Sequence, residues 1–282
     1  MSVLSILILA VIQGICELLP VSSSAHVILA EKLMGLDPTA PEMTLLLAML
    51  HTGTMLAVIV YFWPLWRSRY FASMPLFWSF SKDLTVATGA TGIIGLLLMQ
   101  GIERLVLSGS EHAEIEQLFG NTTVIACGLT AVGIMIILSA KRAPVPHSLA
   151  ALGYRTAALI GIVQGLCLPF RGFSRSGSTI STGLFLGLNK ERAEDFSFAL
   201  AVLLTPAVIA KEGYRFLKAY TISAVHTASL VDLLLPNVLG MIFSFVAGIV
   251  ALWWLSGWLE KGRWHLFGYY CLFAAIVVFT FG

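Results

Sequence analysis

The stretch QGICELLPVSSSAH, residues 13–26, decides the fold because it breaks an otherwise apolar run with polar and helix-ending residues. A second stretch, QGLCLPFRGFSRSGST at residues 164–179, has the same layout of Gln-Gly, Cys, Pro and a serine-rich turn. Pairs of apolar segments that are too short to cross a bilayer are typical of re-entrant hairpins, in which two half-helices enter and leave on one side. We therefore expect re-entrant hairpins at 3–35 and 156–188.

The composition excludes a soluble globular protein. Of the 282 residues, 58% are hydrophobic and 11% are charged, whereas roughly 25% are charged in an ordinary soluble domain. With a mean hydropathy of +0.89, most hydrophobic side chains must face lipid. The net charge of +2 without a basic tract argues against nucleic-acid binding. The four cysteines include no Cys-x-x-Cys pair and indicate neither disulfides nor a zinc site.

Longer apolar stretches supply the membrane spans, each of which needs roughly 20 residues. We predict an all-α polytopic membrane protein, a single membrane domain over residues 1–282, with six spans beside the two hairpins. The predicted spans are 43–63, 84–102, 118–140, 196–213, 233–256 and 264–281.

The two halves of the chain resemble each other. Gln13–Cys16 is echoed by Gln164–Cys167, and the stretch that begins at Met43 is echoed by the one that begins at Phe196. Each half holds one re-entrant hairpin and three transmembrane spans, and an odd number of spans inverts the second copy relative to the first. We therefore expect two inverted-topology repeats. The repeats are residues 1–142 and 143–282.

The connections between spans indicate the orientation of the chain. If residue 43 lies outside and Arg171 and Arg175 lie in the membrane, ten of the seventeen Lys and Arg residues fall in inner connections and five in outer ones. Because positive charge marks the cytoplasmic side, we expect both termini outside and hairpins that enter from opposite faces. The inner ten are Arg67, Arg69, Lys82, Lys141, Arg142, Arg155, Lys190, Arg192, Lys261 and Arg263, and the outer five are Lys32, Arg104, Lys211, Arg215 and Lys218.

Polar and charged side chains cluster at the two breaks. A charge at membrane depth costs roughly 2.5 to 3.5 kcal/mol on insertion scales and is a functional candidate by default. Each serine run opens a second half-helix, where hydroxyls and free N–H groups gather at the positive end of the helix dipole. Two such ends with arginine make a site for phosphate or pyrophosphate. The first set is Gln13, Glu17, Ser22, Ser23, Ser24 and His26, and the second is Arg171, Ser174, Arg175, Ser176, Ser178 and Thr179.

An acid, an imidazole and hydroxyls beside an anion site supply what phosphoryl transfer needs. Arg175 would neutralise phosphate oxygens, and His26 would move a proton or attack. A serine could be the nucleophile, and Glu17 could act as a base or orient the His. The spacing does not order these roles, so a serine, His26 and water remain alternatives for the attacking group.

At these residues the chain resembles the bacitracin-resistance type of undecaprenyl-pyrophosphate phosphatase. The first motif of that family is Glu or Gln, three residues, Glu, and a Pro-Val-Ser-Ser turn that ends in His, and it matches Gln13 to His26. The second motif, Pro-Gly-x-Ser-Arg-Ser-x-x-Thr, matches Arg171 to Thr179. Two positions depart from the pattern. Arg171 replaces Pro and adds a cation beside the phosphate site, and Ala25 stands where Gly commonly precedes the His.

The resemblance implies an enzyme of the bacterial inner membrane that hydrolyses undecaprenyl pyrophosphate to undecaprenyl phosphate and inorganic phosphate, recycling the lipid carrier of peptidoglycan. It implies a multi-pass protein whose active site faces the periplasm. We expect no organic cofactor, and a homodimer is left open. Divalent cations, Mg²⁺ or Ca²⁺, support activity in the family, and Glu17 is expected to contact one. The implied catalytic residues are Glu17, Ser23, His26 and Arg175, and the implied pyrophosphate-binding residues are Gln13, Ser24, Arg171, Ser174, Ser176 and Thr179.

Each of these residues also has a structural interpretation. Glu17 and Arg175 could form an ion pair that serves only the fold, His26 could be a packed or capping residue, and the serines could cap helices. Arg171 could reach a lipid headgroup. We interpret His51, within a span, as a packed polar residue. We interpret Lys190, Glu191, Arg192, Glu194 and Asp195 as a solvated inner loop.

A transporter or flippase for an anionic polyprenyl phosphate is the alternative from a different class, since alternating access uses inverted repeats with broken helices. A second enzyme class, the acid-phosphatase-like lipid phosphatases, carries Ser-Arg, five residues and then His. Here Ser174-Arg175 is followed after five residues by Ser181, which argues against that class.

Overall fold

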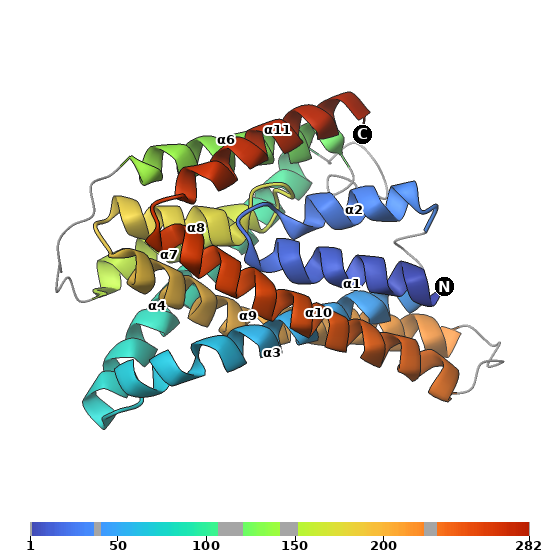
Figure 1. The fold of residues 1–282 in the computed structure, drawn as a ribbon, viewed down its shortest axis with the longest axis horizontal. Helices are drawn as coiled ribbons and strands as arrows, with labels where there is room; N and C mark the ends of the chain where they lie inside the picture. Colours follow the sequence, from blue (N-terminus) through green and yellow to red (C-terminus); the bar gives the residue numbers. More distant parts are fainter. Residues whose placement is uncertain (1, 37–40, 107–120, 142–151, 223–229, 282) are drawn as a thin grey trace.

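The computed structural model describes residues 2–36, 41–106, 121–141, 152–222 and 230–281, and in these ranges it is helical without any strand (Figure 1). The predicted all-α fold is confirmed. Ten helices are described there: α1 Val3–Leu18, α2 Ser23–Leu33, α3 Pro41–Arg69, α4 Met74–Val106, α6 Thr122–Ala140, α7 Tyr154–Cys167, α8 Arg175–Phe185, α9 Lys190–Ile222, α10 Leu230–Glu260 and α11 Trp264–Phe281.

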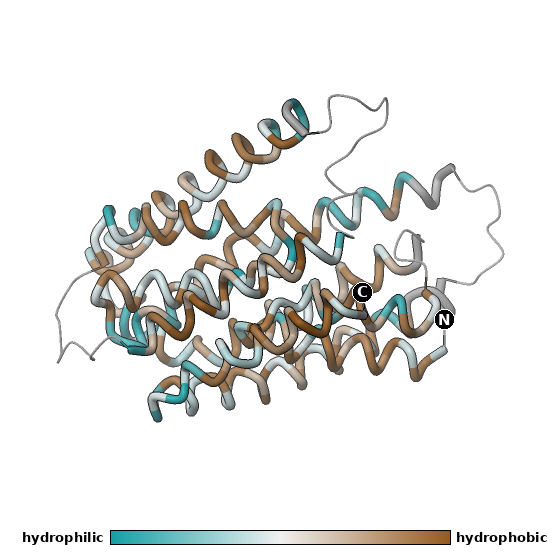
Figure 2. The backbone as a smooth tube through the Cα atoms, turned by 90° about the horizontal axis from the view of Figure 1, so that it is seen from above, coloured by the Kyte–Doolittle hydropathy of each residue, from teal (hydrophilic) through white to brown (hydrophobic). Residues whose placement is uncertain are grey.

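The described part of each predicted span falls within one of these helices, and the two predicted hairpins each correspond to two short helices. The six predicted spans lie in α3, α4, α6, α9, α10 and α11, and the four shorter segments lie mainly in α1, α2, α7 and α8. Residues 118–120 of the third span and the predicted boundary between the repeats, after residue 142, lie outside the described ranges. Figure 2 shows that the helices are hydrophobic over most of their length, with hydrophilic residues concentrated toward their ends.

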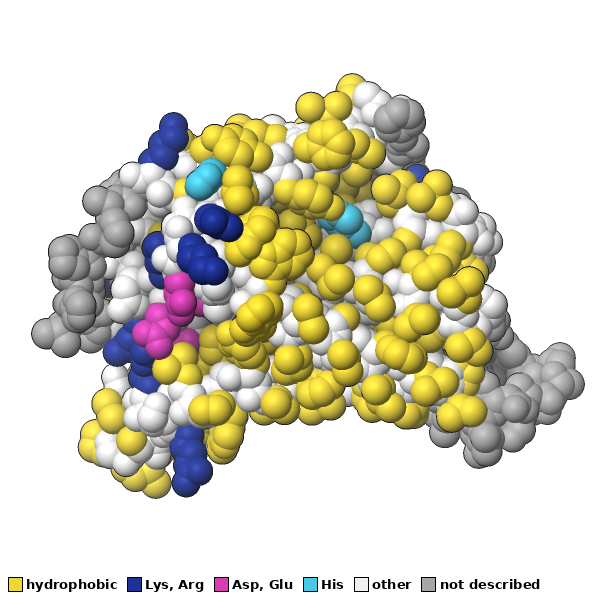
Figure 3. All heavy atoms as spheres, viewed as in Figure 1, with side chains coloured by type: hydrophobic (Ala, Val, Ile, Leu, Met, Phe, Trp, Pro, Cys, Tyr) yellow, Lys and Arg dark blue, Asp and Glu magenta, His cyan; other side chains and the backbone are white. Residues whose placement is uncertain are grey.

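The longest helices have the dimensions of membrane spans. Five of them are long and apolar enough to cross a membrane: Met43–Arg69, Met74–Arg104, Thr122–Ala140, Lys190–Lys218 and Leu235–Glu260. The segments Val3–Leu18 and Trp264–Thr280 are apolar but shorter. In Figure 3, hydrophobic side chains cover most of the visible face, and charged side chains gather toward one end. These features fit a polytopic membrane protein.

Two helices begin earlier than the sequence predicts. The described α4 begins at Met74 and α9 at Lys190, whereas the apolar pattern placed their starts at residues 84 and 196. The hydrogen bonds of a helix join backbone groups, so a helix continues past the end of its apolar segment into polar residues. In α9 the residues that hydropathy missed, 190–195, are mostly charged, whereas in α4 residues 74–83 are mostly apolar and aromatic and were separated from the predicted span by Ser81, Lys82 and Asp83.

The first residues of α9 are helical rather than a loop, and the interpretation as solvated is wrong for Glu194 and Asp195, although Glu191 is exposed. Asp195 is fully buried, forms an ion pair with Arg69 of α3 and accepts a hydrogen bond from Tyr70 Oη at 2.9 Å. Glu194 is also buried and accepts a hydrogen bond from Ser256 of α10 at 2.5 Å. A buried carboxylate requires such partners, and they come from helices that are remote in the sequence. This end of α9 is thereby joined to α3 and α10.

The helices pack in a pattern that pairs the two halves of the chain. In Figure 1, α6 lies along α11, and α3 lies along α10. Helix α1 packs against α10, α7 packs against α4, and α3 also contacts α9. The short helices α1 and α2 contact each other, as do α7 and α8, so each pair is a helical hairpin. The two hairpins lie among the long helices.

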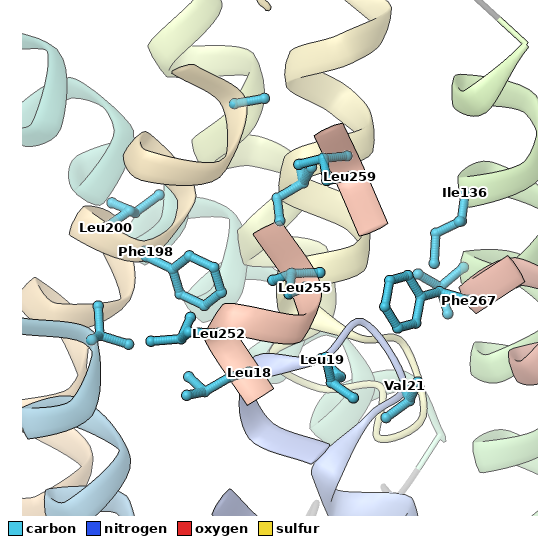
Figure 4. Packing of buried hydrophobic residues seen from close by; sticks show 14 of the residues in the cluster. Leu18, Leu19, Val21, Ile136, Phe198, Leu200, Leu252, Leu255, Leu259 and Phe267 are labelled. Atoms are coloured by element: carbon cyan, nitrogen blue, oxygen red, sulfur yellow. The ribbon is translucent and has the colours of Figure 1, made fainter. Parts of the chain in front are cut away.

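The main hydrophobic core lies where the α1–α2 turn meets helices from the second half. Figure 4 shows Leu18, the last residue of α1, beside Leu252 of α10, and Val21 of the turn on the side toward Phe267 of α11. Leu18, Leu19 and Val21 are buried. Between helices in a bilayer, close van der Waals packing rather than transfer from water holds such side chains together, so this packing holds the turn in place. The other labelled members are Ile136, Phe198, Leu200, Leu255 and Leu259.

Candidate functional site

The two hairpin turns meet. Ser176, in the first turn of α8, donates a hydrogen bond through Oγ to the carbonyl oxygen of Leu19 at 3.3 Å. Gly177 lies so close to the other turn that a Cβ there would be 3.2 Å from Cβ of Pro20. Residues about 157 positions apart in the sequence are thus brought into contact. The polar residues of both hairpins converge on one place.

The local sequence explains why the chain turns in both hairpins. Pro20 and Pro169 lack a backbone N–H and cannot continue the preceding helices. Ser22 has a φ of 67° and is the only residue other than glycine at positive φ in the described ranges, a conformation that is strained for an L residue. Gly172 has a φ of 94°, and a Cβ there would lie 2.2 Å from the carbonyl oxygen of Ile125. A glycine is therefore required at this turn.

Glu17 is the centre of the polar cluster. Its Oε2 accepts a hydrogen bond from Ser23 Oγ at 2.6 Å and one from Gln13 Nε2 at 3.2 Å. Its Oε1 forms an ion pair with Arg175 Nη2 at 3.2 Å. The side chains of Glu17 and Arg175 are 20% and 22% exposed, so the pair lies largely away from solvent. The carboxylate, a hydroxyl and a guanidinium are thus assembled from both hairpins.

A cavity of about 240 Å³ opens beside this cluster. Arg175 Nη1 is buried and has no hydrogen-bond partner within the described part of the chain. A guanidinium with a free buried donor beside hydroxyls suits an oxyanion. The cavity is lined by Cys16, Glu17, Ser22, Ser23, Ser24, His51, Gln164, Cys167, Leu168, Phe170, Arg171, Phe173, Ser174, Arg175, Ser176, Ala201, Leu204, Thr205 and Val208.

Most of the residues predicted to bind pyrophosphate lie on this cavity, but two do not. Ser24, Arg171, Ser174 and Ser176 line it. Gln13 is buried and contacts Glu17 without lining the cavity. Thr179 is fully buried, and its Oγ1 lies 2.6 Å from Oγ of Ser197 and 2.7 Å from the carbonyl oxygen of Arg175. In this arrangement Thr179 supports the first turn of α8.

His26 faces away from the cluster. Its Nδ1 lies 2.8 Å from the carbonyl oxygen of Ser22, and a carbonyl only accepts, so Nδ1 carries the hydrogen. Its Nε2 lies 2.6 Å from Tyr270 Oη, and the two rings stack. His26 lines a separate apolar cavity of about 140 Å³ between α2, α6 and α11. The first turn of α2 therefore presents Ser23 and Ser24 to one cavity and His26 to another.

His51 and Gln164 are among the residues that line the cavity but were not predicted to be part of the site. His51 donates through Nδ1 to the carbonyl oxygen of Leu47 at 2.8 Å, and its Nε2 lies 3.4 Å from Gln13 Nε2. His51 is thus packed, as expected, but it also lines the cavity. Gln164 lines the cavity as well. Gln164 occupies the same position in the second stretch as Gln13 does in the first, and this correspondence could have identified Gln164 as a site residue.

The donor set does not fit a metal centre made by the protein alone. Glu17 is the only carboxylate that lines the cavity within the described residues, and its two oxygens already accept from Gln13, Ser23 and Arg175. The described ranges contain no group of three His, Cys, Asp or Glu side chains placed to hold a metal ion. Divalent cations require several oxygen ligands, and a neighbouring guanidinium opposes them. We therefore derive no chemical step through a metal ion.

Comparison with known proteins shows the family. Residues 6–277 match the family model described as "Bacitracin resistance protein BacA". The chain belongs to this BacA family. It is 57% identical over 282 residues to "Undecaprenyl-diphosphatase 2" of Acinetobacter baylyi, which covers 99% of this chain and 98% of that protein. It is 33% identical over 267 residues to "Undecaprenyl-diphosphatase" of an Anaeromyxobacter species, covering 95% and 84% of the two chains.

A relative of lower identity covers nearly the whole chain as well. The chain is 30% identical to "Undecaprenyl-diphosphatase" of Korarchaeum cryptofilum over 285 residues, 99% of each chain. Membership of this family and the apolar helices together establish a multi-pass membrane protein. The predicted resemblance is confirmed.

Inorganic pyrophosphate is expected to stabilise the folded protein through Arg175. A ligand at one hundred times its dissociation constant stabilises by about 2.7 kcal/mol, which raises the melting temperature of detergent-solubilised protein. Arg175→Ala removes the free Nη1 donor and should abolish the increase. The measurement is thermal unfolding with and without pyrophosphate. An equal increase in Arg175→Ala would show that the anion binds elsewhere.

Proposed function

We propose that the protein hydrolyses undecaprenyl pyrophosphate to undecaprenyl phosphate and inorganic phosphate, and so recycles the lipid carrier for envelope polymers. The observation that carries the proposal is the hydrogen-bonded set Ser23–Glu17–Arg175 at the junction of the two hairpin turns. The names of the relatives support the same reaction. No specific observation favours the transporter alternative.

The geometry supports Ser23 as the nucleophile and Glu17 as its base. The 2.6 Å hydrogen bond from Ser23 Oγ to Glu17 Oε2 is within the reach required of a nucleophile and general base. In the first step, Ser23 Oγ bonds to the terminal phosphorus and its proton passes to Glu17. The bridging P–O bond breaks, and undecaprenyl phosphate leaves with its electron pair. Water then attacks phosphorylated Ser23.

Cations and hydroxyls would hold the phosphates during both steps. Arg175 Nη1 is buried and available, and Arg171 lies on the same cavity. Ser24, Ser174 and Ser176 add hydroxyl donors. Charge-assisted hydrogen bonds from a guanidinium to phosphate are among the strongest in proteins, so we assign the main stabilisation of the transferring phosphoryl group to Arg175.

A catalytic role for His26 requires a rearrangement. Its Nε2 contacts Tyr270 Oη rather than any residue of the Ser23–Glu17–Arg175 set. We propose that His26 transfers a proton only after Tyr270 moves away from Nε2. In the arrangement described here, His26 fixes the first turn of α2 through its hydrogen bond to the carbonyl oxygen of Ser22.

We further propose that the fold consists of two inverted repeats, each with one re-entrant hairpin. The repeats match α1 to α7, α3 to α9, α4 to α10 and α6 to α11. Under this matching, the α1–α10 contact corresponds to the α7–α4 contact, and the α6–α11 and α3–α9 contacts each join a helix to its own counterpart. Such a pattern is expected of interlocked inverted repeats, whose broken helices meet at the bilayer midplane. The excess of Lys and Arg in the inner connections supports a site open to the periplasm and both termini outside.

Purified protein should release phosphate from undecaprenyl pyrophosphate in detergent. Ser23→Ala and Arg175→Ala should each lower kcat by at least about one hundredfold, because each removes a group that acts in the transition state. Phosphate release is measured with a colorimetric assay, alongside a melting curve for each variant. Wild-type turnover in a folded Arg175→Ala sample would contradict the proposed site.

The proposed orientation predicts where fused reporter proteins are active. Alkaline phosphatase, which is active only outside the cytoplasm, should be active when fused after Phe281 and inactive when fused after Lys261, between α10 and α11. A fluorescent protein that matures only in the cytoplasm should give the reverse result. Fluorescence from the fusion after Phe281 would contradict the orientation.

A further inference from the structure

Gln164 carries an unused hydrogen-bond acceptor on the wall of the main cavity. The residue lies on α7 and is fully buried. Its Oε1 has no hydrogen-bond partner within the described residues, although its side chain lines the 240 Å³ cavity. Buried side-chain carbonyls are nearly always paired. An unpaired one that lines a cavity indicates a ligand with a hydrogen to donate.

The orientation of the Gln164 amide follows from its neighbour Thr91. Thr91 Oγ1 lies 2.8 Å from the carbonyl oxygen of Ala87 and 3.0 Å from that of Gly161. The single hydroxyl hydrogen goes to one of these carbonyls, so the Thr91 oxygen is left to accept. Gln164 Nε2 lies 3.3 Å from Thr91 Oγ1 and donates to it. The nitrogen is therefore tied to α4, and Oε1 is the free atom.

The groups around the cavity restrict what can donate to Oε1. Pyrophosphate oxygens are acceptors when ionised, so they would repel the carbonyl rather than pair with it. The hydroxyl of Ser23 already donates to Glu17. A water molecule has two hydrogens, and it can donate one to a carbonyl while its lone pair points at phosphorus. A glutamine orients the attacking water in this way in some nucleotide hydrolases.

We propose that Gln164 Oε1 holds the water that hydrolyses phosphorylated Ser23, a role that rests on the proposed function. In this step the water oxygen bonds to phosphorus and the bond from phosphorus to Ser23 Oγ breaks. Glu17, protonated in the first step, returns a proton to Oγ and takes one from the water, and it then releases that proton to solvent, which restores its carboxylate. The second water hydrogen stays bonded to the oxygen that leaves in the product HPO₄²⁻, and during attack it points at Gln164.

Competition between water and methanol tests this role independently of how much protein is folded. Methanol can attack the same phosphoserine and gives methyl phosphate, but its single O–H cannot serve Glu17 and Gln164 together. Wild-type protein should therefore favour water. Gln164→Met keeps the side-chain length and removes the acceptor, so the ratio of methyl phosphate to inorganic phosphate should rise by up to about tenfold. Both products are quantified from undecaprenyl pyrophosphate labelled in the terminal phosphate.

Two further variants separate water positioning from packing. Thr91→Val removes the hydroxyl that accepts from Gln164 Nε2 while keeping the shape of the side chain. It should raise the ratio of methyl phosphate to inorganic phosphate by a smaller factor than Gln164→Met does. If Gln164→Met does not fold, Thr91→Val serves as the test. Gln13→Met is the matched control, because Gln13 contacts Glu17 but does not line the cavity. It should lower turnover and leave the ratio at the wild-type value.

The outcomes distinguish this role from the proposed function. A raised ratio in Gln164→Met, with Gln13→Met at the wild-type ratio, supports the role of Gln164. A wild-type ratio in folded Gln164→Met, with active wild-type protein, would contradict the role in positioning water. The only remaining role of Gln164 would then be the hydrogen bond that joins α7 to α4. Folded wild-type protein that releases no phosphate would overturn the proposed function and, with it, this role.

Discussion

The ion pair between Glu17 and Arg175 is the interaction on which the rest of the site depends. It joins the two hairpin turns across 158 positions of sequence, and both side chains are largely removed from solvent. A single charge in these surroundings would be strongly destabilising, so each residue requires the other. Once the pair is formed, Ser23 and Gln13 are held by the same carboxylate. The geometry of the nucleophile therefore follows from the pairing of charges.

The pair also explains why the site suits an anion. Glu17 occupies only one nitrogen of the guanidinium, Nη2, and leaves Nη1 buried without a partner among the described residues. An oxyanion at Nη1 would complete the hydrogen bonding of Arg175. Gln164, which also lines the cavity, carries a buried carbonyl oxygen with no hydrogen-bond partner among the described residues. An ionised pyrophosphate oxygen complements the first atom and a donating water molecule complements the second.

The sequence predicted the helices and the pairing of the hairpins because both depend on local patterns. Runs of apolar residues identify helices, and Pro20, Pro169 and the serine runs identify the turns. The convergence of Glu17 and Arg175 followed from the cost of burying single charges. The roles of individual members, as distinct from their proximity, remain predictions.

Other contacts depend on the packing of helices that are remote in the sequence, and no local pattern specified them. Tyr270, which contacts His26, is 244 positions away from it. The burial of Asp195 depends on Arg69, the last residue of α3, and on Tyr70, which follows it. The charged neighbours of Asp195 in the sequence had suggested exposure instead. The free carbonyl of Gln164 is visible only once Thr91 is placed beside its nitrogen.

The most direct test of the account is to trap the phosphorylated intermediate. Undecaprenyl pyrophosphate with radioactive terminal phosphate is mixed with the protein, the reaction is quenched in acid within milliseconds, and the labelled peptide is identified. The account predicts acid-stable label on Ser23 in wild-type protein. Label on another residue, or rapid hydrolysis with no labelled protein at any time, would contradict it.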